Sequence, residues 1–208
     1  PPAGGIALVQ SASGTTADGS AGLTVNFGAP VTAGNSVIAL ISSTDTAEFA
    51  GAGGIPELTN NTNLEEIIVI VGTGVTTWIY AIHNVASGQS SVDFTLNEAV
   101  RASMQILEVS GLADAVATDT DTASGNTATP GVAGLTGNGL AIIISAYANA
   151  TSAYSSGPSG GFTRIGTGTG GASVYQESYY LIGAAGASTI TLSGALDTAS
   201  AGAVVGGV

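Results

Sequence analysis

The sequence predicts an all-β protein, a two-sheet antiparallel β-sandwich of jelly-roll-like type. Three observations predict it. Hydrophobic and polar residues alternate over short stretches, which places one strand face on a core and the other in solvent. Glycine, asparagine and proline recur about every 8–12 residues, a spacing typical of sandwiches and barrels. Apolar runs are rich in β-branched residues, which favour strands. We therefore expect about 12–14 strands in two packed sheets, with no helix longer than about two turns.

Each segment has its own justification. Strict alternation marks strands at residues 23–27, 92–96 and 190–192. Continuous apolar runs at residues 37–41 and 140–144 indicate central strands that are covered on both faces, or on one face by the protein and on the other by a partner.

Two further stretches are predicted to be strands. Residues 67–71 are too short and too β-branched to favour a helix. Residues 96–107 contain good helix formers, but in residues 102–109 Met104 and Ile106 occupy one face while Leu107 occupies the other. We predict a strand there. The glycine-rich residues 166–171 are predicted to form a hairpin tip, because a phosphate-binding loop would need a following helix and a lysine.

The alternation also predicts which side chains form the core. The expected core residues are Leu23, Val25, Phe27, Ile38, Leu40, Val69, Trp78, Phe94, Leu96, Ile106, Ile142, Ile144, Ile190 and Leu192.

The two halves of the chain resemble each other in sequence. Residues 33–42 resemble residues 136–145, and residues 80–96 resemble residues 180–192, with an offset of about 100 residues. This period is far longer than that of solenoids and propellers. Two small domains are one interpretation. We favour a single sandwich domain over residues 1–208, with pseudo-repeats at about 31–110 and 134–208, in which both halves contribute strands to both sheets.

Composition excludes several classes of function. Two arginines and no lysine stand against 14 acidic residues, giving a net charge of −12. This balance is unsuited to nucleic acid and to anionic membrane surfaces. Without cysteine there are no disulfides or thiolate metal sites, and without lysine there is no Schiff-base chemistry. Only 8% of residues are charged, so Thr, Ser, Asn and Gly must form the outer faces.

No catalytic, cofactor or metal site is predicted, and we expect no enzymatic activity. His83 is the single histidine, placed just before a turn, and no serine or carboxylate is singled out as its partner. Asp119 and Asp121 fall on one face of an extended segment. They are either part of a calcium site or solvated residues, because the glycine and distal glutamate of an EF-hand loop are absent.

Tyrosines are the remaining candidates for recognition. Tyr175 and Tyr179 share one strand face and Tyr180 lies on the other, while Tyr147 and Tyr154 flank a polar loop. Exposed tyrosines would suit a sugar ring or a protein partner. Alternatively, these tyrosines fill the core, as we expect of Trp78 and Tyr80.

The order of strands and turns resembles a β-sandwich module of bacteriophage virion proteins, such as head-decoration and tail-fibre proteins, and of secreted bacterial surface proteins. The resemblance covers nearly the whole chain and rests on residues 9–14, 23–27, 30–35, 78–80, 84–88, 105–111 and 160–163. It implies the fold, and it implies a structural role without cofactors.

From this resemblance we expect a non-enzymatic virion protein, most simply a phage capsid decoration, cement or fibre subunit. Its partners would be copies of itself and a major capsid or tail protein. The alternatives are an extracellular subunit of a bacterial surface or filament, and a carbohydrate-binding module. We expect residues 1–5 and 203–208 to make the subunit contacts, so that deleting either end leaves the sandwich folded.

Overall fold

The chain folds entirely into strands and turns wherever the structure describes it. The structure is a computed structural model, and it describes residues 5–16, 20–44, 64–72, 74–127, 129, 131–132, 135–148, 154–156, 161–170, 174–185, 188–189, 191–192 and 196–207. These residues contain no helix, and their strands pair antiparallel, so the predicted all-β class is confirmed. No described helix is therefore long and apolar enough to cross a membrane.

The first half of the chain forms one five-stranded sheet. Its members are β1 (Ala7–Thr15), β3 (Ser36–Thr44), β4 (Leu64–Val71), β5 (Val75–Ile82) and β7 (Ala102–Ser110), in the order β1-β7-β3-β5-β4. A separate pair, β2 (Ser20–Asn26) and β6 (Ser91–Val100), lies against one face of this sheet.

The second half forms another five-stranded sheet. Its members are β8 (Leu112–Thr127), β10 (Gly137–Ala148), β12 (Thr163–Gly170), β13 (Val174–Ala185) and β16 (Leu196–Gly207), in the order β12-β13-β10-β16-β8. Two short pairs accompany it: β9 (Gly131–Val132) with β14 (Ser188–Thr189), and β11 (Tyr154–Ser156) with β15 (Thr191–Leu192).

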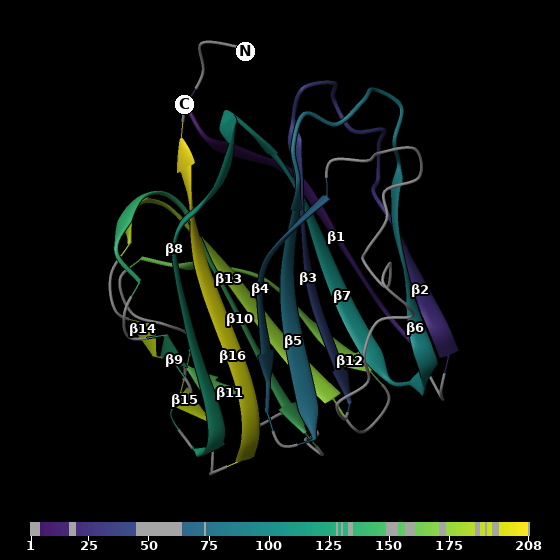
Figure 1. Ribbon diagram of the computed structural model, residues 1–208, viewed down its shortest axis with the longest axis vertical. Coiled ribbons are helices and arrows are strands. Elements are labelled where there is room, and N and C mark those ends of the chain that lie inside the picture. The colour runs from purple at the N-terminus through teal and green to yellow at the C-terminus, as the bar shows by residue number, and fades with distance from the viewer. Residues whose placement is uncertain are drawn as a thin grey trace.

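The two large sheets pack face to face. One apolar cluster joins Ile38 and Leu107 of the first sheet to Ile142 and Ala203 of the second. A second cluster lies between the first sheet and the β2–β6 pair, and a third covers the opposite face of the second sheet. Figure 1 shows this sequence of layers, from β2 and β6 at the right to β9 and β14 at the left.

The division of strands between sheets corrects one expectation. We expected both halves to contribute to both sheets, but each large sheet takes all its strands from one half. Alternation specifies only that a strand is covered on a given face, and it carries no information about which segment provides the cover.

Most core expectations are confirmed. Trp78, Phe94, Ile106 and Ile142 are buried, as alternation predicts. Likewise buried are Val25, Phe27, Ile38, Leu40 and Ile144, and Leu23 packs half-buried against its cluster. The side chains of Leu96 and Leu192, and all of Ile190, lie outside the described residues.

Val69 contradicts the core prediction, because its side chain is 40% exposed. It lies on β4, which is the edge strand of its sheet, and there Ile68 and Ile70 take the face that packs against the second sheet. Among the described residues, the cluster beneath the β2–β6 pair includes side chains from β1, β3, β5 and β7 but none from β4, so the face of β4 that carries Val69 lacks this cover.

The predicted strand positions agree with the structure, apart from the hairpin tip. Residues 102–109 lie in β7, and the runs 37–41 and 140–144 lie in β3 and β10, the middle strands of the two sheets. The hairpin tip expected at residues 166–171 is wrong for residues 166–170, which belong to β12. The described residues contain sixteen strands, more than the 12–14 expected, because four of the strands are only two or three residues long.

Candidate functional site

His83 lies where the sequence places it, immediately after β5 and before a turn. Its Nδ1 is 3.1 Å from the Ser36 hydroxyl at the start of β3. Ser36 and His83 are only 1% and 6% exposed, so a substrate could not reach either group without opening the core. The contact ties the beginning of β3 to the end of β5, which is a structural role.

Glu108 is a buried carboxylate that organises the turn before β3. It accepts hydrogen bonds from the Gln10 amide at 2.6 Å, the Thr32 backbone N–H at 2.8 Å and the Asn35 amide at 2.5 Å. Burial alone would raise the pKa of Glu108, but these donors outweigh it and hold the pKa below its ordinary value. All the partners belong to the protein, so the group is satisfied without a ligand.

A second buried carboxylate, Glu177 on β13, is paired with Arg164 on β12. The guanidinium Nε and Nη2 each lie 2.7 Å from a carboxylate oxygen, a bidentate arrangement. Burial raises the pKa of Glu177 in spite of the opposing effect of Arg164. The carboxylate has no exposed surface, whereas the Arg164 side chain is 41% exposed.

Three of the five tyrosines that were candidates for sugar recognition are core residues. Tyr147, Tyr175 and Tyr179 are buried beside this ion pair, and the rings of Tyr147 and Tyr175 stack with centroids 5.7 Å apart. Tyr180 points to the other face, as predicted, and packs half-buried between the large sheets. The Tyr154 side chain lies outside the described residues. The buried rings cannot grip a sugar, so that hypothesis loses its main support.

Asp119 and Asp121 lie on β8 as an extended pair, but their oxygens are used locally. Asp119 accepts hydrogen bonds from the Thr136 backbone N–H at 2.7 Å and the Thr136 hydroxyl at 2.9 Å, and the backbone bond from Thr136 is the main cause of its lowered pKa. Asp121 accepts from the Thr122 backbone N–H at 2.9 Å. The described residues contain no group of three or more potential metal ligands, so nothing there completes a calcium site.

Each large sheet has a buried glutamine that points toward the other large sheet, and the two glutamines differ in their surroundings. Gln176 on β13 is fully partnered, accepting from the Ser42 hydroxyl at 2.7 Å and donating to the Leu40 carbonyl and the Ser178 hydroxyl. Gln105 on β7 is equally buried, but neither its Nε2 nor its Oε1 has a hydrogen-bond partner among the described residues.

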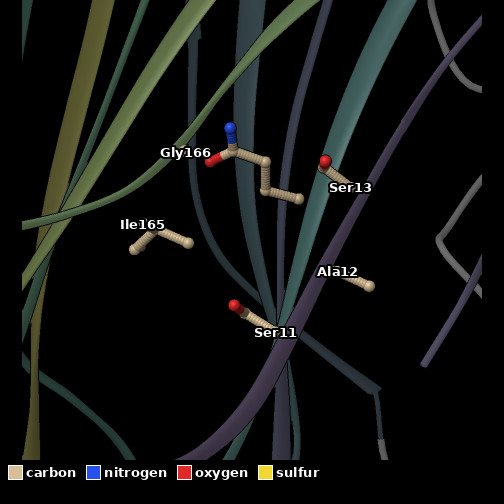
Figure 2. A pocket seen from close by; sticks show the side chains of 6 residues that line it. Ser11, Ala12, Ser13, Ile165 and Gly166 are labelled. Carbon is tan, nitrogen blue, oxygen red and sulfur yellow. The ribbon is translucent and has the colours of Figure 1, made fainter. Parts of the chain in front are cut away.

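Gln105 borders a small cavity between β1, β7 and β12. The cavity has a volume of about 120 Å³ and is also lined by Ser11, Ser13, Ile165 and Gly166. Figure 2 shows Ser11 and Ser13 from β1 on one side and Ile165 and Gly166 from β12 on the other. No charged residue lines it, so the cavity suits a neutral polar group.

Large apolar side chains are exposed on both edge strands of the first sheet and on β13 of the second. Among the described residues the large ones are Val9, Val69, Val71 and Ile182. Val9 belongs to β1 and the other two valines belong to β4, and these strands are the two edges of the first sheet. β1 carries no charged residue at all. β1, an uncharged edge strand with an exposed valine, is weakly protected against pairing with another chain, whereas β4 carries Glu65 and Glu66 near its start.

The C-terminal segment is not the free contact element that we expected. Ala203, Val204 and Val205 are buried in β16, which lies between β10 and β8. Deleting residues 203–208 would remove part of an inner strand, so the expectation that this deletion leaves the fold intact is wrong. Residues 1–4, at the other end, lie outside the described residues.

In comparisons with known proteins, no family model, curated protein or solved structure matches the chain.

Sequence reasoning did not single out Gln105, Gln176 or the Glu108 network. Polar residues in an alternating strand are normally assigned to the solvent-facing side, but the side chains of Gln105, Gln176 and Glu108 are all buried. A signal was nonetheless present for Gln105. It occupies the same strand face as Leu107, which places a polar group in line with core residues.

Proposed function

We propose that the chain is a structural subunit that works by assembling with other chains, and that its two halves are copies of one jelly-roll-like sandwich unit. In the first half the paired strands are nested: β3 with β5, β2 with β6, and β1 with β7. In the second half β10 with β13, β9 with β14, and β8 with β16 follow the same nesting. A chain rolled up as nested antiparallel pairs is the arrangement meant by a jelly roll.

The order of strands within the large sheets supports the repeat. When the five strands of each sheet are numbered in chain order, the spatial order is first, fifth, second, fourth and third, read from the β1 edge of the first sheet and from the β8 edge of the second. The segments that resemble each other at an offset of about 100 residues lie on corresponding strands, β3 with β10 and β5 with β13. Jelly rolls occur in viral capsid and lectin domains, so this architecture is compatible with a virion protein by analogy of fold alone.

One observation carries the proposed role: the exposed valines Val9, Val69 and Val71 lie on edge strands of a protein with very few basic residues. Edge strands present backbone N–H and C=O groups that another strand can pair with. With two arginines and no lysine, contacts between copies cannot rest on a network of ion pairs. Backbone pairing and burial of these valines would have to provide the attraction.

The biological setting follows from the resemblance and is part of the proposal. The preferred setting is a phage particle, with the chain acting as a decoration, cement or fibre subunit and contacting copies of itself and a capsid or tail protein. An extracellular bacterial surface or filament subunit uses the same contacts, and a low-resolution image of the native particle distinguishes the two settings.

Self-association is tested by sedimentation velocity of the full chain across a range of salt. Each copy carries a net charge of −12, and salt screens the repulsion between copies beyond about 10 Å at 0.1 M. We expect the assembled fraction to rise with salt, and a stable contact to bury about 1,200–2,000 Å².

A charge placed on the edge tests the surface itself. The double substitution Val69→Lys and Val71→Lys should shift the population to monomer, whereas Ala86→Lys, in an exposed turn away from the sheet edges, should not. A chain that is monomeric at every salt and protein concentration, or an assembly that dissolves as salt rises, would contradict the proposal.

A further inference from the structure

The unpartnered amide of Gln105 is the most unusual buried group among the described residues. Each of its two polar atoms has less than 1 Å² of exposed surface and no hydrogen-bond partner there. A buried amide that loses its bonds to water and gains none in return destabilises the fold. Two residues earlier on the same strand face, the Ser103 hydroxyl is in the same condition. The polar character of this position therefore calls for an additional partner.

The cavity beside Gln105 provides room for one. Its volume of about 120 Å³ corresponds to about four water molecules at about 30 Å³ each. That is far smaller than the sites that hold cofactors or drug-sized molecules, which span about 300–1,000 Å³. An occupant would be the size of one polar side chain.

The lining determines the chemistry of that occupant. A partner for Gln105 must accept a hydrogen bond from Nε2 and donate one to Oε1. A carboxylate cannot donate and an ammonium group cannot accept, and the lining has no charge to neutralise either. Ser13 is paired with Gln105 in the β1–β7 register and lines the same cavity, so it adds a hydroxyl to the lining. A primary carboxamide provides the acceptor and the donor in one planar group.

Access to the amide is set by Gly166 on β12. A methyl group added at Gly166 would lie 3.3 Å from Gln105 Nε2, so the glycine backbone packs directly over the amide. The cavity lies alongside this contact, and the terminal torsion of a glutamine has a broad energy minimum. To bond an occupant of the cavity, the Gln105 amide would have to turn about that torsion toward the cavity, because neither of its polar atoms is exposed there.

We propose that the cavity between β1, β7 and β12 binds a primary carboxamide through Gln105. The carboxamide is either a free small amide or the side chain of an asparagine or glutamine from another chain. This site does not depend on the proposed assembly role, because it is tested on the isolated protein.

Binding is measured by NMR on the isotopically labelled full chain. Acetamide is titrated while the backbone amides of Ser13 and Gly166 and the side-chain amide of Gln105 are followed. We expect saturable shifts at these positions, with half-saturation on the order of 10 mM for so small a ligand. Acetate, which cannot donate, should give none at the same concentrations, and glycerol, which lacks the planar donor–acceptor pair of an amide, should bind more weakly than acetamide. Saturable shifts with glycerol but not with acetamide, or with neither, would overturn the proposal.

Variants separate binding from folding. Gln105→Leu should weaken acetamide binding at least tenfold while leaving the melting temperature equal or higher, since it removes an unpartnered amide. The matched control is Gln176→Leu, which removes a fully partnered amide and should lower the melting temperature. If Gln105→Leu lowers it as much as the control does, Gln105 has a protein partner and the proposal fails.

A third variant leaves the glutamine in place. Gly166→Ala adds a methyl group against the amide and should weaken acetamide binding several-fold in a folded protein. The source of the carboxamide is settled by two short peptides that differ only in Gln or Glu at their centre. Tighter binding of the Gln peptide than of acetamide indicates a partner chain, and equal or weaker binding indicates a free amide; a preference for the Glu peptide would overturn the proposal.

Discussion

Replacing Arg164 by leucine should expose how much the buried carboxylate of Glu177 depends on its partner. The wild-type pair is bidentate, with both N–O distances at 2.7 Å, and Glu177 has no exposed surface. Leucine keeps much of the apolar volume of the arginine stem but provides no donor. The substitution therefore leaves a carboxylate that is out of contact with water and without its counter-charge.

The magnitude follows from the burial of the two partners. Breaking a fully buried ion pair by removing one member costs about 3–5 kcal/mol, whereas an exposed pair contributes about 0–1 kcal/mol. Here one partner is fully buried and the Arg164 side chain is 41% exposed, so solvent screens part of the interaction. We expect Arg164→Leu to lower the free energy of unfolding by about 2 kcal/mol at neutral pH.

The sign of the pH dependence follows from the pKa of Glu177. Burial raises this pKa above its ordinary value of 4.5. A carboxyl with a raised pKa in the folded state stabilises the fold most below its unfolded pKa, and that contribution is lost as pH rises through the folded pKa. Removing Arg164 raises the folded pKa further. The cost of Arg164→Leu should therefore be smaller at pH 5 than at pH 8.

Urea denaturation at pH 5 and pH 8 measures both effects. The control is the double variant Arg164→Leu with Glu177→Gln, which removes the charge and should recover much of the loss at pH 8. An equal loss at the two pH values, or a double variant no more stable than the single one, would refute the electrostatic account and assign the effect to packing.

Three other substitutions test separate parts of the fold. Glu108→Gln should lower the free energy of unfolding, measured by urea denaturation, by about 2 kcal/mol at pH 7, because a neutral amide cannot accept from all three donors. Since the pKa of Glu108 is lowered in the folded protein, this loss should become smaller as pH falls below 4.5. Phe94→Ala, at 3% exposure, should cost about 3–5 kcal/mol in the same measurement. Gly202→Ala places a methyl 2.7 Å from a leucine side chain and should cost about 1–3 kcal/mol by thermal unfolding, whereas Gly28→Ala meets nothing and should be close to neutral.

The fold was predictable from sequence wherever a residue's own neighbours determine its conformation. Alternation located β7 correctly although residues 96–107 contain good helix formers, because the two faces of residues 102–109 are both apolar at alternate positions. What covers those faces depends on contacts between distant segments. The assignment of each half to its own sheet therefore did not follow, and neither did the exposure of Val69 on an edge.

The candidate sites were less predictable, for a related reason. The sequence pattern around Tyr147 and Tyr175 is the same whether they bind a ligand or fill a core. Their burial depends on the distant residues that cover the outer face of the second sheet, such as Val132 and Leu135. Gln105 and Gln176 are indistinguishable in an alternating pattern. Their difference arises from which groups the opposite sheet places within hydrogen-bonding distance.

The separation of the two halves into separate sheets has a consequence for synthesis of the chain. Every strand of the first sheet ends by Ser110, so its backbone pairing can be complete before residues 112–207 have left the ribosome. During that interval the face that carries Ile38, Leu40 and Leu107 has no cover, because its cover comes from the second sheet. A nascent chain paused at this stage would present a flat apolar sheet, the kind of surface that aggregates or recruits a chaperone, so the rate at which the second half is made becomes part of the folding yield.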